Sequence, residues 1–151
     1  PYTTLFRSNY RNNRNNQFSI TNDYGNDPFV VNIEKITEQN KNFRTTLWTG
    51  TYMQVTLMSI EPSSSIGLEV HPETDQFFRI ESGMGQVFMG KSRENLNFRQ
   101  NVKNGFAVFV PAGIWHNVIN VGKVPLKLYS VYAPPHHPRG TVNQTKNDLD
   151  S

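Results

Sequence analysis

Cysteine is absent from this chain of 151 residues. Disulfides, zinc ribbons and thiol catalysis are therefore excluded, and any metal ion must be held by histidine, carboxylate or amide side chains. Long hydrophobic runs are missing too: none approaches the roughly 18 to 20 residues that span a bilayer, and the N-terminal stretch lacks a secretory-signal pattern. We therefore expect a soluble, cytoplasmic protein with no membrane partner.

An acidic excess is also missing, because 15 basic residues outnumber 12 acidic ones and give a formal net charge of +3. Several of the basic residues lie in the polar ends of the chain, and no DNA- or RNA-binding motif with interleaved aromatic residues is present. We therefore expect no nucleic-acid partner, and a small molecule as the substrate or ligand.

Helical periodicity is scarce, with one weak 3.6-residue pattern at residues 32–40. From residue 28 onward, about ten short apolar and β-branched runs follow one another, separated by Gly, Pro, Asn and Ser. Several of them alternate with a period of two, as Phe106, Val108 and Val110 do. Closely spaced strands with turns between them predict an all-β protein, a closed jelly-roll barrel that forms a single domain.

The two ends of the chain differ in composition from the middle. Residues 9–27 are rich in Asn and poor in aliphatic side chains, so we interpret residues 1–27 as a flexible arm. Residues 1–8 lack an initiator Met and carry no functional interpretation. The predicted barrel covers residues 28–138, and the Pro-rich and polar end at 139–151 is interpreted as a flexible tail.

The most informative spacing reads Gly67-Leu-Glu69-Val-His71-Pro-Glu-Thr-Asp-Gln76 and ends seven residues later at Gly83. Residues i and i+2 of a strand face the same way, so Glu69 and His71 are expected to project together from one side of a sheet. A barrel turns that side inward. After a turn, Gln76 can begin the next strand with its amide directed at the same point.

A second cluster places His116 at the start of a strand, after a Pro/Gly corner, which makes this residue the natural fourth donor. The two stretches together resemble the paired motifs of the cupin superfamily. The second stretch matches the signature of that family at Gly105, Pro111, Gly113, His116 and Asn120. The resemblance covers roughly residues 28 to 138 and is greatest to the small single-domain cupins described as similar to phosphomannose isomerase.

The first motif departs from the commonest cupin pattern. Glu69 stands at the first His position, His71 is retained, and Gln76 stands at the usual Glu position. The resemblance thus implies a double-stranded β-helix fold in which Glu69, His71, Gln76 and His116 hold one divalent metal ion. This mixed nitrogen and oxygen donor set suits Mn, Fe, Co, Ni or Zn without selecting one of them.

No general base is identified, so the catalytic residues stay unassigned. Glu73 and Asp75 lie on the predicted turn, where solvated carboxylates are ordinary. Arg79 follows Gln76 by three residues and is expected to face outward, as a surface or dimer contact. Arg44 is no better determined.

Two adjacent histidines, His136 and His137, follow two prolines near the end of the predicted barrel. Adjacent side chains diverge, and the segment lies outside both motifs, so we interpret them as surface or packing residues. Four aromatic residues are candidates to line the pocket, although core positions are more usual for such side chains. They are Trp48, Tyr52, Trp115 and Tyr129.

These residues predict a metal-dependent enzyme that acts on a small polar metabolite, such as a sugar, sugar phosphate or hydroxy-carbonyl compound, by proton transfer or isomerisation. A metal-dependent dioxygenase is one alternative. A non-enzymatic cupin, with a ligand-binding or structural role, is another. We also expect a homodimer, because the Asn-rich arm and the FVVNI segment at residues 29–33 could add a strand to a neighbouring sheet.

Overall fold

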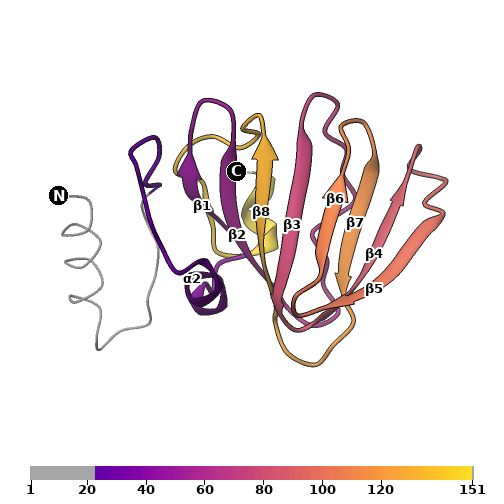
Figure 1. The fold of residues 1–151 in the computed structure, drawn as a ribbon. Helices are drawn as coiled ribbons and strands as arrows, with labels where there is room; N and C mark the ends of the chain where they lie inside the picture. Colours follow the sequence, from indigo (N-terminus) through magenta and orange to yellow (C-terminus); the bar gives the residue numbers. More distant parts are fainter. Residues whose placement is uncertain (1–22, 151) are drawn as a thin grey trace.

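Nine β-strands in two sheets dominate the part of the protein that the structure, a computed structural model, describes, residues 23–150 (Figure 1). In spatial order, the larger sheet consists of β6 (Ala107–Val110), β3 (Asp75–Ser82), β8 (Leu126–Ala133), β2 (Gln54–Ile60), β1 (Arg44–Thr49) and β9 (Val142–Asn143). The smaller sheet consists of β5 (Phe98–Lys103), β4 (Met84–Gly90) and β7 (Trp115–Asn120). The helical elements are α2 (Ile33–Gln39) and the short 3-10 helix η1 (Lys146–Asp150).

All neighbouring strands pair antiparallel. Buried side chains from both sheets pack into one core, as Phe78 of β3 and Val87 of β4 do. The chain crosses from the larger to the smaller sheet at Gly83, whose φ is 90°. A Cβ atom here would lie 2.9 Å from the carbonyl oxygen of Pro125, so glycine is required. The prediction of an all-β jelly-roll barrel is confirmed.

No helix in residues 23–150 has the length and apolar character needed to cross a membrane.

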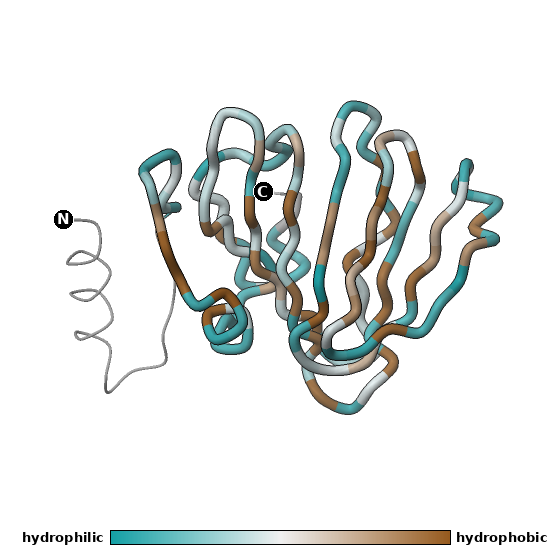
Figure 2. The backbone as a smooth tube through the Cα atoms, in the orientation of Figure 1, coloured by the Kyte–Doolittle hydropathy of each residue, from teal (hydrophilic) through white to brown (hydrophobic). Residues whose placement is uncertain are grey.

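The interior of the barrel changes character along β2 and β8. Ile60 of β2 pairs with Leu126 of β8, and both are fully buried. Toward the other end of the same two strands, Thr56 pairs with Ser130, and these side chains are buried as well. Figure 2 shows hydrophobic residues along the strands, whereas most of the loops are hydrophilic. The barrel therefore has one apolar end and one polar end.

A second apolar cluster covers the outer face of β1 and β2. Ile36 of α2 packs there with Leu47 and Leu57. The FVVNI segment at residues 29–33, predicted to be a strand, leads into α2 instead, and Phe29 packs against this cluster. All seven residues of β2 are buried because both of its faces are covered. The weak helical pattern at residues 32–40 is realised as α2 (Ile33–Gln39).

The boundaries of the folded unit differ from those drawn on the sequence. Residues 139–151 were predicted to be a flexible tail, but Val142 and Asn143 pair with Thr45 and Arg44 of β1. The strand that closes this edge carries too few apolar residues to be detected by periodicity. The arm predicted at residues 1–27 lies outside the described residues except for its last five.

Asp23 joins these two ends of the described chain. Its buried carboxylate accepts hydrogen bonds from the backbone N–H groups of Thr49 at 2.9 Å, Gly25 at 2.9 Å and Gly140 at 3.3 Å. The Thr49 hydroxyl donates a further bond at 2.5 Å. Burial alone raises the pKa of Asp23, but these hydrogen bonds outweigh it and lower the pKa below its ordinary value of 3.8.

Replacing Asp23 with asparagine should lower the free energy of unfolding by roughly 1 to 3 kcal/mol at pH 7, because the new amide meets backbone donors with a donor of its own. A lowered carboxyl pKa contributes stability above the unfolded pKa and loses it as pH falls through the folded pKa. The deficit should therefore shrink below about pH 4. Urea unfolding at pH 7 and pH 3 measures it. Asp27→Asn, at an exposed site, is the matched control, and equal effects of the two variants would contradict this role.

Candidate metal centre

The segment that carries Glu69 runs beside β7. The backbone N–H of Glu69 donates to the carbonyl oxygen of His116 at 3.0 Å, and the N–H of His116 donates back to Glu69 at 2.9 Å. This two-residue bridge stands where the sequence analysis expects a strand that carries Glu69 and His71. Directly paired residues present their side chains on the same face, so the bridge brings Glu69 and His116 together from distant parts of the chain.

Three predicted ligands converge on one point. Oε1 of Glu69 lies 3.4 Å from Nε2 of His71 and 3.5 Å from Nε2 of His116. The donor atoms of the three residues all lie within 4.8 Å of one another. His71 and His116 are buried, at 4% and 1% exposure, whereas the Glu69 side chain is 25% exposed. The expectation that Glu69 and His71 share a face agrees with this arrangement.

A backbone carbonyl determines which nitrogen of His116 carries the hydrogen. Nδ1 lies 3.0 Å from the carbonyl oxygen of Ile114, and a carbonyl can only accept, so Nδ1–H is the donor. In the neutral form of this tautomer Nε2 bears a lone pair, and it is this atom that lies beside the Glu69 carboxylate. Metal-bound histidines are usually oriented in the same way, by a carbonyl that accepts from the other ring nitrogen.

Three ring nitrogens of this cluster are buried without a hydrogen-bond partner among the described residues. They are Nε2 of His116 and both ring nitrogens of His71. Burial by itself raises the pKa of Glu69, but His116 and then His71 outweigh it and hold the pKa well below its usual range. The ionised oxygen of Glu69 and the ring nitrogens can all donate electron pairs to one cation placed among them. Imidazole and carboxylate are good ligands for divalent transition metals, so these residues fit such an ion.

Gln76, the fourth predicted ligand, lies in the interior of the larger sheet. It is 4% exposed and belongs to β3, between Val110 of β6 and Tyr132 of β8. Its amide nitrogen donates to the hydroxyl of Ser130 at 3.3 Å. Its side-chain oxygen is buried and has no hydrogen-bond partner among the described residues. The free lone pairs of Gln76 are therefore on the oxygen, the atom that coordinates metals.

Two further rings pack against His71, and the sequence analysis assigned neither to the site. The ring of Tyr132 lies 5.7 Å from that of His71, and its buried phenol oxygen has no hydrogen-bond partner in the described chain. The ring of His136 lies 4.0 Å from that of His71. Alternation along β8 could have identified Tyr132, because Leu128, Ser130 and Tyr132 share the inward face. No local pattern marks His136.

Gln54 fixes the loop that carries His136 and His137. Its side-chain oxygen accepts from the backbone N–H groups of His136 at 3.1 Å and His137 at 2.9 Å. Its amide nitrogen donates to the carbonyl oxygen of His137 at 2.8 Å and to the hydroxyl of Thr49 at 3.0 Å. Gln54 is fully buried, so its hydrogen bonds hold this loop against the polar end of the barrel.

The other charged candidates have distinct positions. Glu73 is exposed, and the carboxylate of Asp75 accepts from the backbone N–H of Ala112 at 2.8 Å, which fixes the corner before β7. Arg79 lies on the outside, as expected, and pairs with Glu81 at 3.1 Å. Arg44, which the sequence left undetermined, is 3% exposed.

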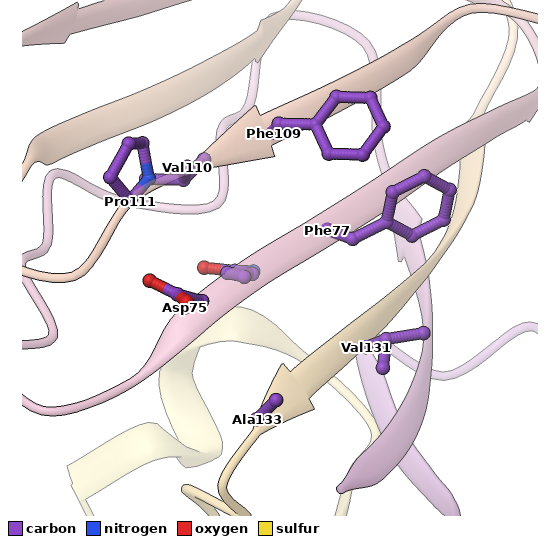
Figure 3. Close-up of a pocket in the computed structure, with 8 residues that line it drawn as sticks. Asp75, Phe77, Phe109, Val110, Pro111, Val131 and Ala133 are labelled. Atoms are coloured by element: carbon purple, nitrogen blue, oxygen red, sulfur yellow. The ribbon is translucent and has the colours of Figure 1, made fainter.

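A pocket of about 330 Å³ lies on the outer face of the larger sheet. Phe77 of β3 and Phe109 of β6 line it, with Val131 of β8 close by, and their side chains lie on the same side of the sheet (Figure 3). The rings of Phe77 and Phe109 meet edge to face with centroids 5.1 Å apart. Because side chains alternate along a strand, this pocket lies on the opposite face of β3 from the buried Phe78.

Comparisons with known proteins agree with this architecture. Residues 56–132 match the family model described as Cupin domain. The chain is 61% identical over 129 residues to the uncharacterized protein YrkC of Bacillus subtilis (strain 168), which covers 85% of this chain and 69% of that protein. It is 35% identical over 119 residues to the uncharacterized protein L612 of Acanthamoeba polyphaga mimivirus, with 78% and 72% covered.

A solved structure has the same fold. The crystal structure of BH2720 from Bacillus halodurans superposes with a TM-score of 0.83 at 56% sequence identity. The superposition covers 83% of this chain and 96% of that one.

Proposed function

Because the chain belongs to the cupin-domain family, as a small single-domain cupin with the double-stranded β-helix fold, we propose that it holds one divalent metal ion and acts on a small polar metabolite. Glu69, His71, Gln76 and His116 are the proposed ligands. One observation carries this proposal: three metal-ligating atoms converge within 4.8 Å, and the nitrogens among them have no hydrogen-bond partner in the described chain.

The proposed chemistry is metal-assisted proton transfer or isomerisation. When bound, a divalent ion in such a site polarises a substrate carbonyl and acidifies a neighbouring hydroxyl. The carbonyl of Ile114 orients the His116 ring, and burial of both histidines excludes water from their nitrogens. Burial raises the pKa of Tyr132, and the nearby Glu69 charge raises it further. The phenol therefore keeps its proton and offers an O–H donor to a ligand oxygen.

Elemental analysis of the full chain, purified without chelator or nickel resin, tests the metal. We expect close to one Mn, Fe, Co, Ni or Zn ion per chain, and its loss in a His71→Ala/His116→Ala variant. The metal found directs the substrate screen: turnover of hydroxy-carbonyl compounds without oxygen uptake supports the isomerase-like reaction. Wild-type protein that folds and stays empty after dialysis against each ion would contradict the proposal.

Two other outcomes correspond to the alternatives drawn from the sequence. Oxygen consumption that depends on a redox-active metal would assign the chain to the dioxygenases. Ligand binding without turnover, unaffected by chelator, would assign it to the non-enzymatic cupins. The homodimer stays a prediction. The FVVNI segment is not the strand that would join the two sheets, because residues 29–31 lead into α2 and do not form an open edge strand.

A further inference from the structure

Arg44 lies inside the barrel. It pairs with Met58 of β2 on one side and with Asn143 of β9 on the other. Met58 belongs to the interior core, and directly paired residues share a face, so the Arg44 side chain is on the inner face of the sheet. Thr46, two residues further along β1, pairs with Thr56 at the polar end. Arg44 is 3% exposed.

The guanidinium of Arg44 has no ion-pair partner in the described part of the chain. Its Nε is buried without a hydrogen-bond partner there. The guanidinium lies over the ring of Phe43, with its carbon 5.4 Å from the ring centroid. A buried charge without a partner is costly, and proteins usually provide a counter-ion or a network of hydrogen bonds.

The positive charge of Arg44 reaches the polar end of the barrel. Burial lowers the pKa of His137 to about 3, and the charge of Arg44 is the second cause. His137 is therefore neutral at pH 7. A narrow cavity in the barrel interior is lined by Met58, which pairs with Arg44, and by the proposed ligand Gln76. Arg44 thus shares the interior of the barrel with the proposed metal centre.

The charges at this end of the barrel do not balance. Glu69 is the carboxylate in the cluster and supplies one negative charge. A bound divalent ion and the Arg44 guanidinium would together supply three positive charges. Resting on the proposed function, we propose that Arg44 binds the carboxylate or phosphate of an anionic ligand held in the metal pocket. A guanidinium presents a planar fork of N–H donors that fits both groups, which an ammonium does not.

A purely structural role makes a different prediction. If Arg44 serves only to fill space beside Phe43, then replacing it with methionine should not raise the melting temperature of the protein. If the charge is retained for a ligand, then Arg44→Met removes an unpaired buried charge, and the ligand-free protein should melt at the same or a higher temperature. A lower melting temperature combined with unchanged anion binding would assign a structural role.

Titration calorimetry tests the ligand class. The probes are inorganic phosphate, malonate and the uncharged analogue malonamide, each added to Mn²⁺-loaded and metal-free full chain. We expect phosphate or malonate, but not malonamide, to bind the wild type, and Arg44→Gln to weaken this binding at least about tenfold. Arg99→Gln, an exposed arginine on β5, is the matched control and should bind as the wild type does.

The two anions distinguish the two kinds of ligand. A preference for phosphate indicates a phosphorylated ligand, and a preference for malonate indicates a carboxylic acid. Equal binding by Arg44→Gln and the wild type, equal binding of malonamide and malonate, or no binding of either anion would overturn the proposal. Metal content is measured on the same samples. Loss of anion binding with metal retained supports Arg44, whereas anion binding that requires Arg44 in a chain that takes up no Mn²⁺ would contradict only the proposed metal site.

Discussion

Replacing Glu69 with glutamine should remove the bound metal ion and leave the protein folded. The ionised oxygen of Glu69 lies between two imidazole nitrogens, at 3.4 and 3.5 Å. A glutamine amide in its place is neutral and can donate to the lone pair of His116 or His71, so the metal-free cluster gains a hydrogen bond. Loss of a neighbour of a metal ligand costs roughly 10- to 100-fold in affinity, and we expect loss of the ligand itself to cost more than about 100-fold.

Competition with a fluorescent chelator measures the affinity, and thermal unfolding of the metal-free variant measures the fold. We expect the metal-free Glu69→Gln protein to melt at or above the temperature of the metal-free wild type. Glu73→Gln, an exposed carboxylate on the neighbouring turn, is the control and should retain wild-type affinity. Wild-type affinity in Glu69→Gln would show that the metal, if present, is held elsewhere.

Replacing Gln54 with leucine should destabilise the protein by roughly 2 to 4 kcal/mol, since each buried polar group left unpaired costs about 1 to 3 kcal/mol. The change keeps the volume of the side chain but removes four hydrogen bonds. The groups left behind include the backbone N–H groups of His136 and His137 and the carbonyl oxygen of His137. The loop should then leave the barrel, and the His136 ring should lose its contact with His71.

Urea unfolding measures the stability, and amide hydrogen exchange at His136 and His137 measures the loop directly. Exchange at these two amides should become faster by more than the global loss of stability explains. Gln100→Leu, on the exposed strand β5, is the matched control and should change stability by less than about 0.5 kcal/mol. Protection of both amides in Gln54→Leu would show that the cluster of rings holds the loop without the glutamine.

The part of the site that a sequence can predict is the part built on local periodicity. Glu69 and His71 share a face because side chains alternate, and the corner at Pro111 and Gly113 places His116 at the start of β7. The same alternation predicts the barrel, because the inward positions of its strands are apolar at one end. These patterns need only a few neighbouring residues, so the chain itself displays them.

The remaining features depend on contacts between distant segments. His136 lies beside His71 because Gln54, 82 residues earlier, binds its backbone. The strand β1 is covered on both faces, so its apolar pattern does not show that Arg44 faces inward. The short strand β9 forms because β1 offers it an edge, and two residues are too few to show a strand pattern of their own.

The bond between Asp23 and Gly140 restricts the order in which this protein can assemble. The two residues are 117 positions apart, and the strands β1 and β9, which pair with each other, are also far apart in the chain. Pairings of this range form late, because loop closure must be overcome before they contribute. During synthesis, β1 leaves the ribosome while β8 and β9 do not yet exist. The nascent chain therefore presents β1 and β2 as a hairpin whose two outer edges are unpaired. These edges are the part most open to mispairing and to binding by chaperones.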